Sequence, residues 1–178
     1  MAKLKMTYMP PDNSEGGDGI VFSRLHKGDV AFTPGLGWLR WNQYVWEASE
    51  TQVFGIARDD SKARLEEAQA YNMQATTNLA KMEGDETADP DELKRAQNEA
   101  KNAKFYLSHA KAGRKVRAMK NVLEAAKPDF EKPLEAFDAD WDLLNTPKFV
   151  VDLKSGKHLS SNPELYMTRS TAVSPNYS

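Results

Sequence analysis

The 178-residue sequence contains no cysteine, and none of its apolar runs approaches the length of a membrane span. Without cysteine, the chain cannot be a disulfide scaffold, cannot use a thiol nucleophile and cannot bind a metal through thiolates. A membrane helix needs about 18 or more consecutive apolar residues, so we expect none. The N-terminus, MAKLKMTYMPP, also lacks the apolar stretch of a secretory signal. These absences favour a soluble, cytoplasmic protein.

The chain also carries little net charge. Its 24 lysines and arginines are balanced by 26 acidic residues, which leaves a formal charge of −2. This balance excludes a uniformly basic nucleic-acid-binding protein, but it allows a local basic patch. Hydrophobic residues make up 40% of the sequence and aromatic residues 10%. At this length they suffice for the core of one domain, with or without tails.

The N-terminal residues 1–19 are polar and contain the breaks Pro10-Pro11 and Gly16-Gly17. These features predict a flexible tail. A short helix could follow over residues 20–27, and we treat residues 20–178 as a single domain.

An aromatic-rich segment, residues 30–49, predicts short antiparallel strands. Asn42-Gln43 separates two of its runs and predicts a tight two-residue hairpin turn. In that register one face of the hairpin carries Leu39, Trp41, Tyr44 and Trp46. This face is either part of the core or a stacking platform for nucleic-acid bases.

Two long helices are predicted next. Residues 51–82 consist mostly of helix formers and contain no proline. After a loop, Asp89-Pro90-Asp91-Glu92 is typical of a helix start, with a capping acid, a proline at the first helical position and a glutamate three residues after the cap. This helix should run to about Ala110.

Because the apolar stripes of both helices are weak, we expect residues 51–110 to project as an exposed antiparallel helical hairpin.

A third helix should follow Gly113 and end near Ala126, because Pro128 and Pro133 oppose its continuation. Its apolar positions recur at spacings of three and four, which places them on one face toward a core. The predicted core consists of Trp38, Trp41, Trp46, Val116, Met119, Leu123, Phe137, Leu143 and Leu144.

The C-terminal part returns to loops and short strands. Residues 148–153 and 158–159 flank Lys154-Ser155-Gly156-Lys157 and predict a second hairpin. The predicted fold class is therefore α+β, mostly helical, with small antiparallel hairpins near the N-terminus and near residue 150.

Motifs for catalysis or metal binding are incomplete. The acids of the segment 138–142 have the spacing of a calcium loop, but Leu143 and Phe149 stand where that loop needs glycine and glutamate. Capping and turn formation are the roles that these acids suit. Gly156-Lys157 lacks the first glycine and the final hydroxyl residue of a phosphate loop. We therefore predict no catalytic residues, no metal site and no cofactor.

The stretch from Ala100 to Leu123 contains seven basic residues and no acidic one. It is either a solvated helix face or a surface that contacts phosphate backbones, where a basic cluster gains affinity by releasing counterions. The candidate DNA-binding residues are Lys104, Lys111, Arg114, Lys115, Arg117 and Lys120.

Three blocks of the sequence, in the order found here, resemble a known family. The first is Gly35–Trp41 followed by Trp46, the second is Tyr106–Lys127, and the third is Phe137–Pro147 followed by Val150–Lys157. They resemble the region immediately N-terminal to the superfamily-three helicase motor in phage, plasmid and poxvirus primase-helicases. The resemblance covers about residues 20 to 173.

Two departures accompany the resemblance. The family commonly has Asn-Gly where this chain has Lys148-Phe149, and the helical insertion at 51–110 differs in length. In such proteins a primase domain precedes this region and an ATP-driven helicase follows it. The resemblance therefore implies a non-catalytic linker or collar domain that adjoins both.

The same resemblance implies that the domain helps to assemble a hexameric ring and binds DNA weakly, without sequence preference. The implied setting is replication of phage or prophage DNA in the bacterial cytoplasm. The chain would then be a fragment of a DNA helicase-primase or a free-standing relative of its linker. The alternative is a stand-alone, phage-derived adaptor that binds a protein partner through its helical hairpin.

Overall fold

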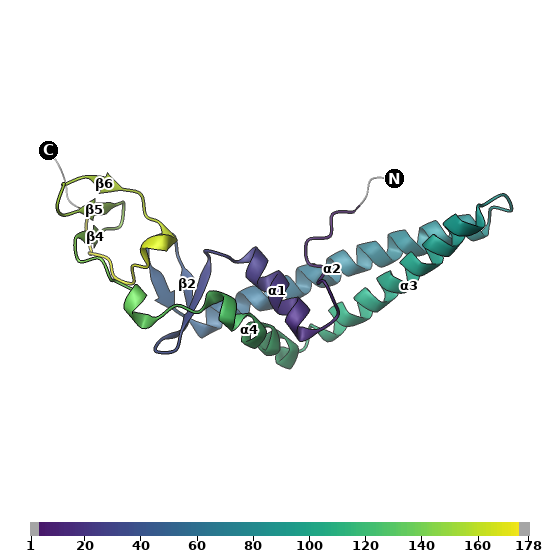
Figure 1. Cartoon of the computed structure of the whole chain (residues 1–178), viewed down its shortest axis with the longest axis horizontal. Coiled ribbons are helices and arrows are strands. Elements are labelled where there is room, and N and C mark those ends of the chain that lie inside the picture. The colour runs from purple at the N-terminus through teal and green to yellow at the C-terminus, as the bar shows by residue number, and fades with distance from the viewer. Residues whose placement is uncertain (1–3, 175–178) are drawn as a thin grey trace. The chain divides into compact units, whose positions relative to one another are not determined.

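The computed structural model describes residues 4–174 and divides the chain into two compact units. The helical unit comprises Met1–Phe22 and Ile56–Ala125, and the sheet unit comprises Ser23–Gly55 and Ala126–Ser178. In chain order (Figure 1), the elements are α1 Glu15–Leu25, β1 Val30–Thr33, β2 Gly37–Trp41, β3 Trp46–Ala48, α2 Glu50–Glu83, α3 Pro90–Ala112, α4 Val116–Phe130, the 3-10 turn Leu134–Ala136, β4 Leu143–Asn145, β5 Val150–Asp152, β6 His158–Leu159 and the 3-10 turn Pro163–Leu165. The predicted fold class, α+β and mostly helical, is confirmed.

The first sheet of the sheet unit has the antiparallel order β1-β2-β3. Trp41 pairs with Trp46, so the loop between β2 and β3 has four residues, and the predicted two-residue turn is wrong. The Asn42 carboxamide oxygen accepts the backbone N–H groups of Tyr44 and Val45, each at 2.9 Å. These bonds stabilise the wider loop, in which Tyr44 is exposed.

Both faces of this sheet contribute to a core. On one face the indole of Trp38 makes edge-on contacts with the rings of Phe32 and Phe130, with centroids 5.4 and 5.7 Å apart. On the other face Leu39 and Trp46 belong to a buried cluster with Ala31 and Phe137. Trp46 also donates its indole N–H to the carbonyl of Pro163 at 2.9 Å. The interpretation of the tryptophan face as core is therefore correct for Trp46.

The second sheet has the antiparallel order β4-β5-β6. Val150 pairs with Leu159 and Val151 with His158, which confirms the hairpin predicted near residue 150. Gly156 adopts a φ of 69° in its turn, a conformation that costs glycine little because it has no Cβ. Strand β4 was not predicted, since three residues give too little alternation to recognise.

In the helical unit, α2 and α3 form the predicted antiparallel hairpin (Figure 1). As expected, α3 begins at Pro90, and the side chain of Asp89 caps it by accepting the N–H of Asp91 at 3.0 Å. Small residues recur every seven positions along the buried sides of the two helices. This seam consists of Ser61, Ala68 and Ala75 on α2 and of Ala96, Ala103 and Ala110 on α3.

Helix α1 begins at Glu15, five residues before the predicted start, so the expected flexible tail does not describe residues 15–19. The Ser14 hydroxyl accepts the N–H of Gly17 at 3.0 Å and caps the helix. Gly17 is needed because a Cβ there would lie 2.5 Å from the carbonyl oxygen of Asp12. Gly17, one of the two glycines that suggested a break in the sequence, therefore allows α1 to lie close to the backbone of Asp12.

Two other expectations about α4 and the core are corrected. Helix α4 continues through Pro128 to Phe130. Near the end of the helix, proline removes only one backbone N–H, and the buried Phe130 ring packs on Trp38 and stabilises the last turn. The single predicted core is divided between the two units, and Val116 and Leu144 are exposed. Met119 and Leu123 are buried in the helical unit as predicted.

Candidate nucleic-acid interface

All six candidate DNA-binding residues are exposed. They come from three consecutive parts of the chain. Lys104 and Lys111 lie on α3, Arg114 and Lys115 lie in the short connection after it, and the other two, Arg117 and Lys120, lie on α4. The end of α3 and the start of α4 therefore present cations to solvent without an intervening acid in the sequence.

Arg114 has a structural role that the sequence did not reveal. One guanidinium nitrogen, Nη1, donates to the Ser61 hydroxyl at 2.9 Å and to the carbonyl of Arg58 at 3.2 Å. Ser61 in turn donates to the same carbonyl at 2.6 Å. Arg114 therefore ties the connection after α3 to α2, which makes it a weaker candidate for phosphate contact than its neighbours.

Lys104 and Lys111 line a groove between α2 and α3 that has a volume of about 680 Å³. A third lysine, Lys101, lines it as well. The remaining lining residues are Asn72, Thr76, Leu79, Gln97, Ala100, Leu107 and Ser108. No carboxylate is among these lining residues, so the groove has a positive potential suited to a polyanion.

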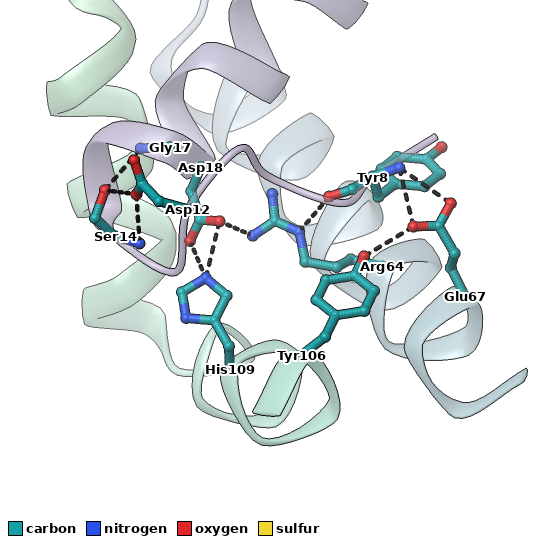
Figure 2. A network of polar contacts seen from close by, with 9 residues as sticks. All are labelled: Tyr8, Asp12, Ser14, Gly17, Asp18, Arg64, Glu67, Tyr106 and His109. Carbon is teal, nitrogen blue, oxygen red and sulfur yellow. Dashed lines mark hydrogen bonds and ion pairs between the residues drawn. The ribbon is translucent and has the colours of Figure 1, made fainter. Parts of the chain in front are cut away.

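A buried polar network in the same unit was missed by sequence reasoning (Figure 2). Asp18 of α1 pairs with Arg64 of α2 at 2.6 Å and contacts the His109 ring of α3 at 2.9 Å. The side chains of Asp18 and Arg64 are only 6% and 7% exposed. Burial of unpaired charges is costly, so each of these two groups depends on the other.

The same network attaches the N-terminal segment to α2 and α3 (Figure 2). Arg64 Nε donates to the carbonyl of Tyr8 at 3.2 Å, and the Glu67 carboxylate accepts the backbone N–H groups of Thr7 and Tyr8. Tyr106 donates its hydroxyl to Glu67 at 2.8 Å. Burial, followed by this hydrogen bond and the Glu67 charge, raises the pKa of Tyr106 well above its ordinary value.

This network holds the N-terminal segment, α1, α2 and α3 together. The cavity next to Arg64 has a volume of about 20 Å³, which is room for a water molecule at most. Arg64 and Asp18 use their charges on each other, so neither is presented to a substrate. No sequence pattern identifies such a network, because its bonded partners are separated by up to 91 positions.

Across residues 4–174 there is no group of three or more histidine or acidic side chains that could hold a metal ion. Of the acids in the 138–142 segment, Asp140 has the predicted role in a turn, whereas Asp138 and Asp142 contact residues outside their own loop. Asp138 accepts the N–H of Thr168 at 2.7 Å, Asp140 accepts the N–H of Asp142, and Asp142 pairs with Lys154 at 2.5 Å. Within the described chain no helix is long and apolar enough to cross a membrane.

Comparison with known proteins supports the resemblance found in the sequence. No curated protein matches the chain. A family described as D5 N terminal like matches residues 19–178, which is most of the chain. The chain therefore belongs to the D5 N-terminal-like family, a domain of phage- and poxvirus-type primase-helicase proteins.

Proposed function

We propose that this chain is a non-catalytic DNA-replication module, the linker or collar domain of a phage-type primase-helicase, and that it contacts DNA weakly and without sequence preference. The observation that carries the DNA contact is the cluster of exposed cations at the end of α3 and the start of α4, a stretch of sequence that contains no acidic residue. Cations clustered in this way release counterions from a phosphate backbone whatever the base sequence. Membership of the D5 N-terminal-like family supports the replication setting.

The partners in this proposal are adjoining helicase and primase domains and further copies of the chain in a hexameric ring. The rest of the surface is slightly acidic, since the whole chain has a net charge of −2. We therefore expect dissociation constants of about 10⁻⁴–10⁻⁶ M at physiological salt, as for other non-specific contacts. A ring would present several copies at once and raise the avidity. The proposed location is the cytoplasm of a bacterium that carries the phage.

The test replaces Lys115, Arg117 and Lys120 with glutamine, which leaves the structural Arg114 in place. Fluorescence anisotropy of a labelled single strand is measured over a salt series. Each phosphate contact contributes about 0.7 to the slope of log affinity against log salt, so the triple variant should lower the slope by about 2.

The matched control replaces three exposed cations elsewhere on the hairpin, Lys62 and Lys81 of α2 and Arg95 of α3, with glutamine. It removes the same charge and should reduce the slope less. Equal slopes for the control and the test variant would show that only net charge matters and would contradict the proposed surface.

The alternative function is that of an adaptor that binds a protein through the α2–α3 hairpin. It is favoured by two large apolar side chains on this hairpin, Met73 and Phe105, which are 68% and 56% exposed. Exposed apolar groups of this size mark protein interfaces when they gather in a patch. Loss of a protein partner in the double variant Met73→Ser, Phe105→Ser, with unchanged DNA binding and unchanged oligomer formation, would favour this alternative.

A further inference from the structure

The groove between α2 and α3 is built to hold an extended anion. Its cations are Lys101, Lys104 and Lys111, which all come from the same side of α3. At 1.5 Å of rise per residue, the ten residues from the first to the last span about 15 Å of helix axis. The ligand must therefore carry several negative charges spread along its length rather than one.

The neutral lining of the groove also suits phosphate groups. Amides and hydroxyls occur on both helices, and they include Asn72 on α2 with Gln97 and Ser108 on α3. Such groups donate hydrogen bonds to phosphate oxygens without selecting a base. The leucines Leu79 and Leu107 provide an apolar surface beside the cations.

Phe105 stands beside the groove and is 56% exposed. The Lys101 ammonium lies over its ring, with Nζ 6.0 Å from the centroid. An exposed aromatic face next to a row of cations is the arrangement by which proteins hold single strands, since bases stack on the ring while cations follow the backbone. In a duplex, base faces are already stacked on each other and unavailable to the ring.

We propose that this groove binds single-stranded nucleic acid, with phosphates along Lys101, Lys104 and Lys111 and one base stacked on Phe105. The inference rests on the proposed function, because it names the form of nucleic acid and the site for a module that contacts DNA. At 3.4 Å per nucleotide of a stacked strand, a groove of about 15 Å accommodates about four nucleotides.

Two variants test the two parts of the site in the full chain, with a labelled oligothymidylate as the probe. Replacement of Lys101, Lys104 and Lys111 with glutamine should lower the salt slope by about 2. Phe105→Leu should weaken binding about tenfold without changing the slope, because it removes a stacking surface and no charge. Phe105→Tyr and the triple Lys→Arg variant preserve the ring and the charges, and should bind nearly as wild type.

The controls separate this inference from the proposed function. If the Lys115, Arg117 and Lys120 variant lowers the slope and the groove variant does not, the groove is overturned while the proposed DNA contact stands. If neither variant changes the slope, both are overturned. A duplex that competes as well as the single strand also overturns the inference, as does full affinity in Phe105→Leu. Preferential binding of an acidic helical peptide to the groove would identify a protein site instead.

Discussion

The exposure of individual side chains decides which tryptophans stabilise the sheet unit. Trp38 is 2% exposed and contacts Phe32 and Phe130, whereas Trp41 is only half-buried beside Trp46. Removal of a fully buried aromatic side chain loses its transfer free energy and leaves a cavity. A half-buried ring loses less of both.

We expect Trp38→Ala to lower the free energy of unfolding by about 3–5 kcal/mol and Trp41→Ala to lower it less. Denaturant unfolding followed by tryptophan fluorescence measures both, since all four tryptophans lie in the sheet unit. Trp141 is 90% exposed and serves as a nearly constant background. If Trp41→Ala abolishes binding of single-stranded DNA and leaves stability unchanged, the β2–β3 face is a stacking platform after all.

A second prediction at this scale concerns alkaline pH. The pKa of Tyr106 is raised in the folded chain, chiefly by burial, while an unfolded tyrosine loses its proton near pH 10. Above that pH unfolding releases a proton from this residue, so the stability that it contributes is complete below about pH 10 and falls as pH rises further. Tyr106→Phe should remove this part of the pH dependence.

Helix unfolding measured by circular dichroism between neutral and alkaline pH checks this prediction. Tyr8 and Tyr71 also have raised pKa values through burial, so a smaller dependence should persist in the variant. Parallel profiles for wild type and Tyr106→Phe would contradict the buried hydrogen bond to Glu67.

At the scale of secondary-structure elements, the seam of small residues occupies buried positions of α2 and α3. Ala68 and Ala103 are completely buried, and neither has a side chain beyond Cβ. The apolar stripes of these two helices are weak in the sequence, because alanine is weakly hydrophobic and common in any helix. The heptad spacing of small residues was the signal that could have identified the contact surface.

We expect Ala103→Leu to destabilise the helical unit by about 1–3 kcal/mol, because the added atoms have no free volume between the helices. Ala80→Leu is the matched control, because Ala80 is exposed on α2. The same change from alanine to leucine alters the intrinsic helix propensity equally at both positions. Thermal unfolding by circular dichroism compares the two variants. Equal melting temperatures would mean that the helices are not packed through Ala103.

At the scale of the whole molecule, the two units carry different features. The helical unit holds the groove and the six candidate cations, and the sheet unit holds the tryptophan-rich core. Neither unit contains, within the described residues, a cluster of potential metal ligands. Phosphoryl transfer requires organised metal and phosphate ligands.

The proposed non-catalytic function predicts that the chain by itself hydrolyses no ATP and makes no primer. The measurements are phosphate release and primer extension with single-stranded DNA and Mg²⁺ present. An ATPase activity that co-purifies with the chain through several columns and is stimulated by DNA would contradict the non-catalytic assignment.

The sequence by itself determined the features that depend on neighbours in the chain. The start of α3 follows from Asp89 and Pro90, and the β5–β6 turn follows from Gly156, because caps and turns are set by bonds between nearby residues. The ordered blocks of residues also led to the family. The exposure of the candidate cations followed from their position off the apolar stripe.

Only the tertiary structure decided the features that depend on distant partners. Asp18 is stabilised by Arg64 and His109, which extends α1 across glycines that locally disfavour a helix. Arg114 is bound to α2, and its assignment to phosphate contact weakens for that reason. The groove itself exists only where α2 and α3 lie side by side, because residues of both helices line it. Local propensities contain no information about such contacts, because their free energy arises only when the chain has folded.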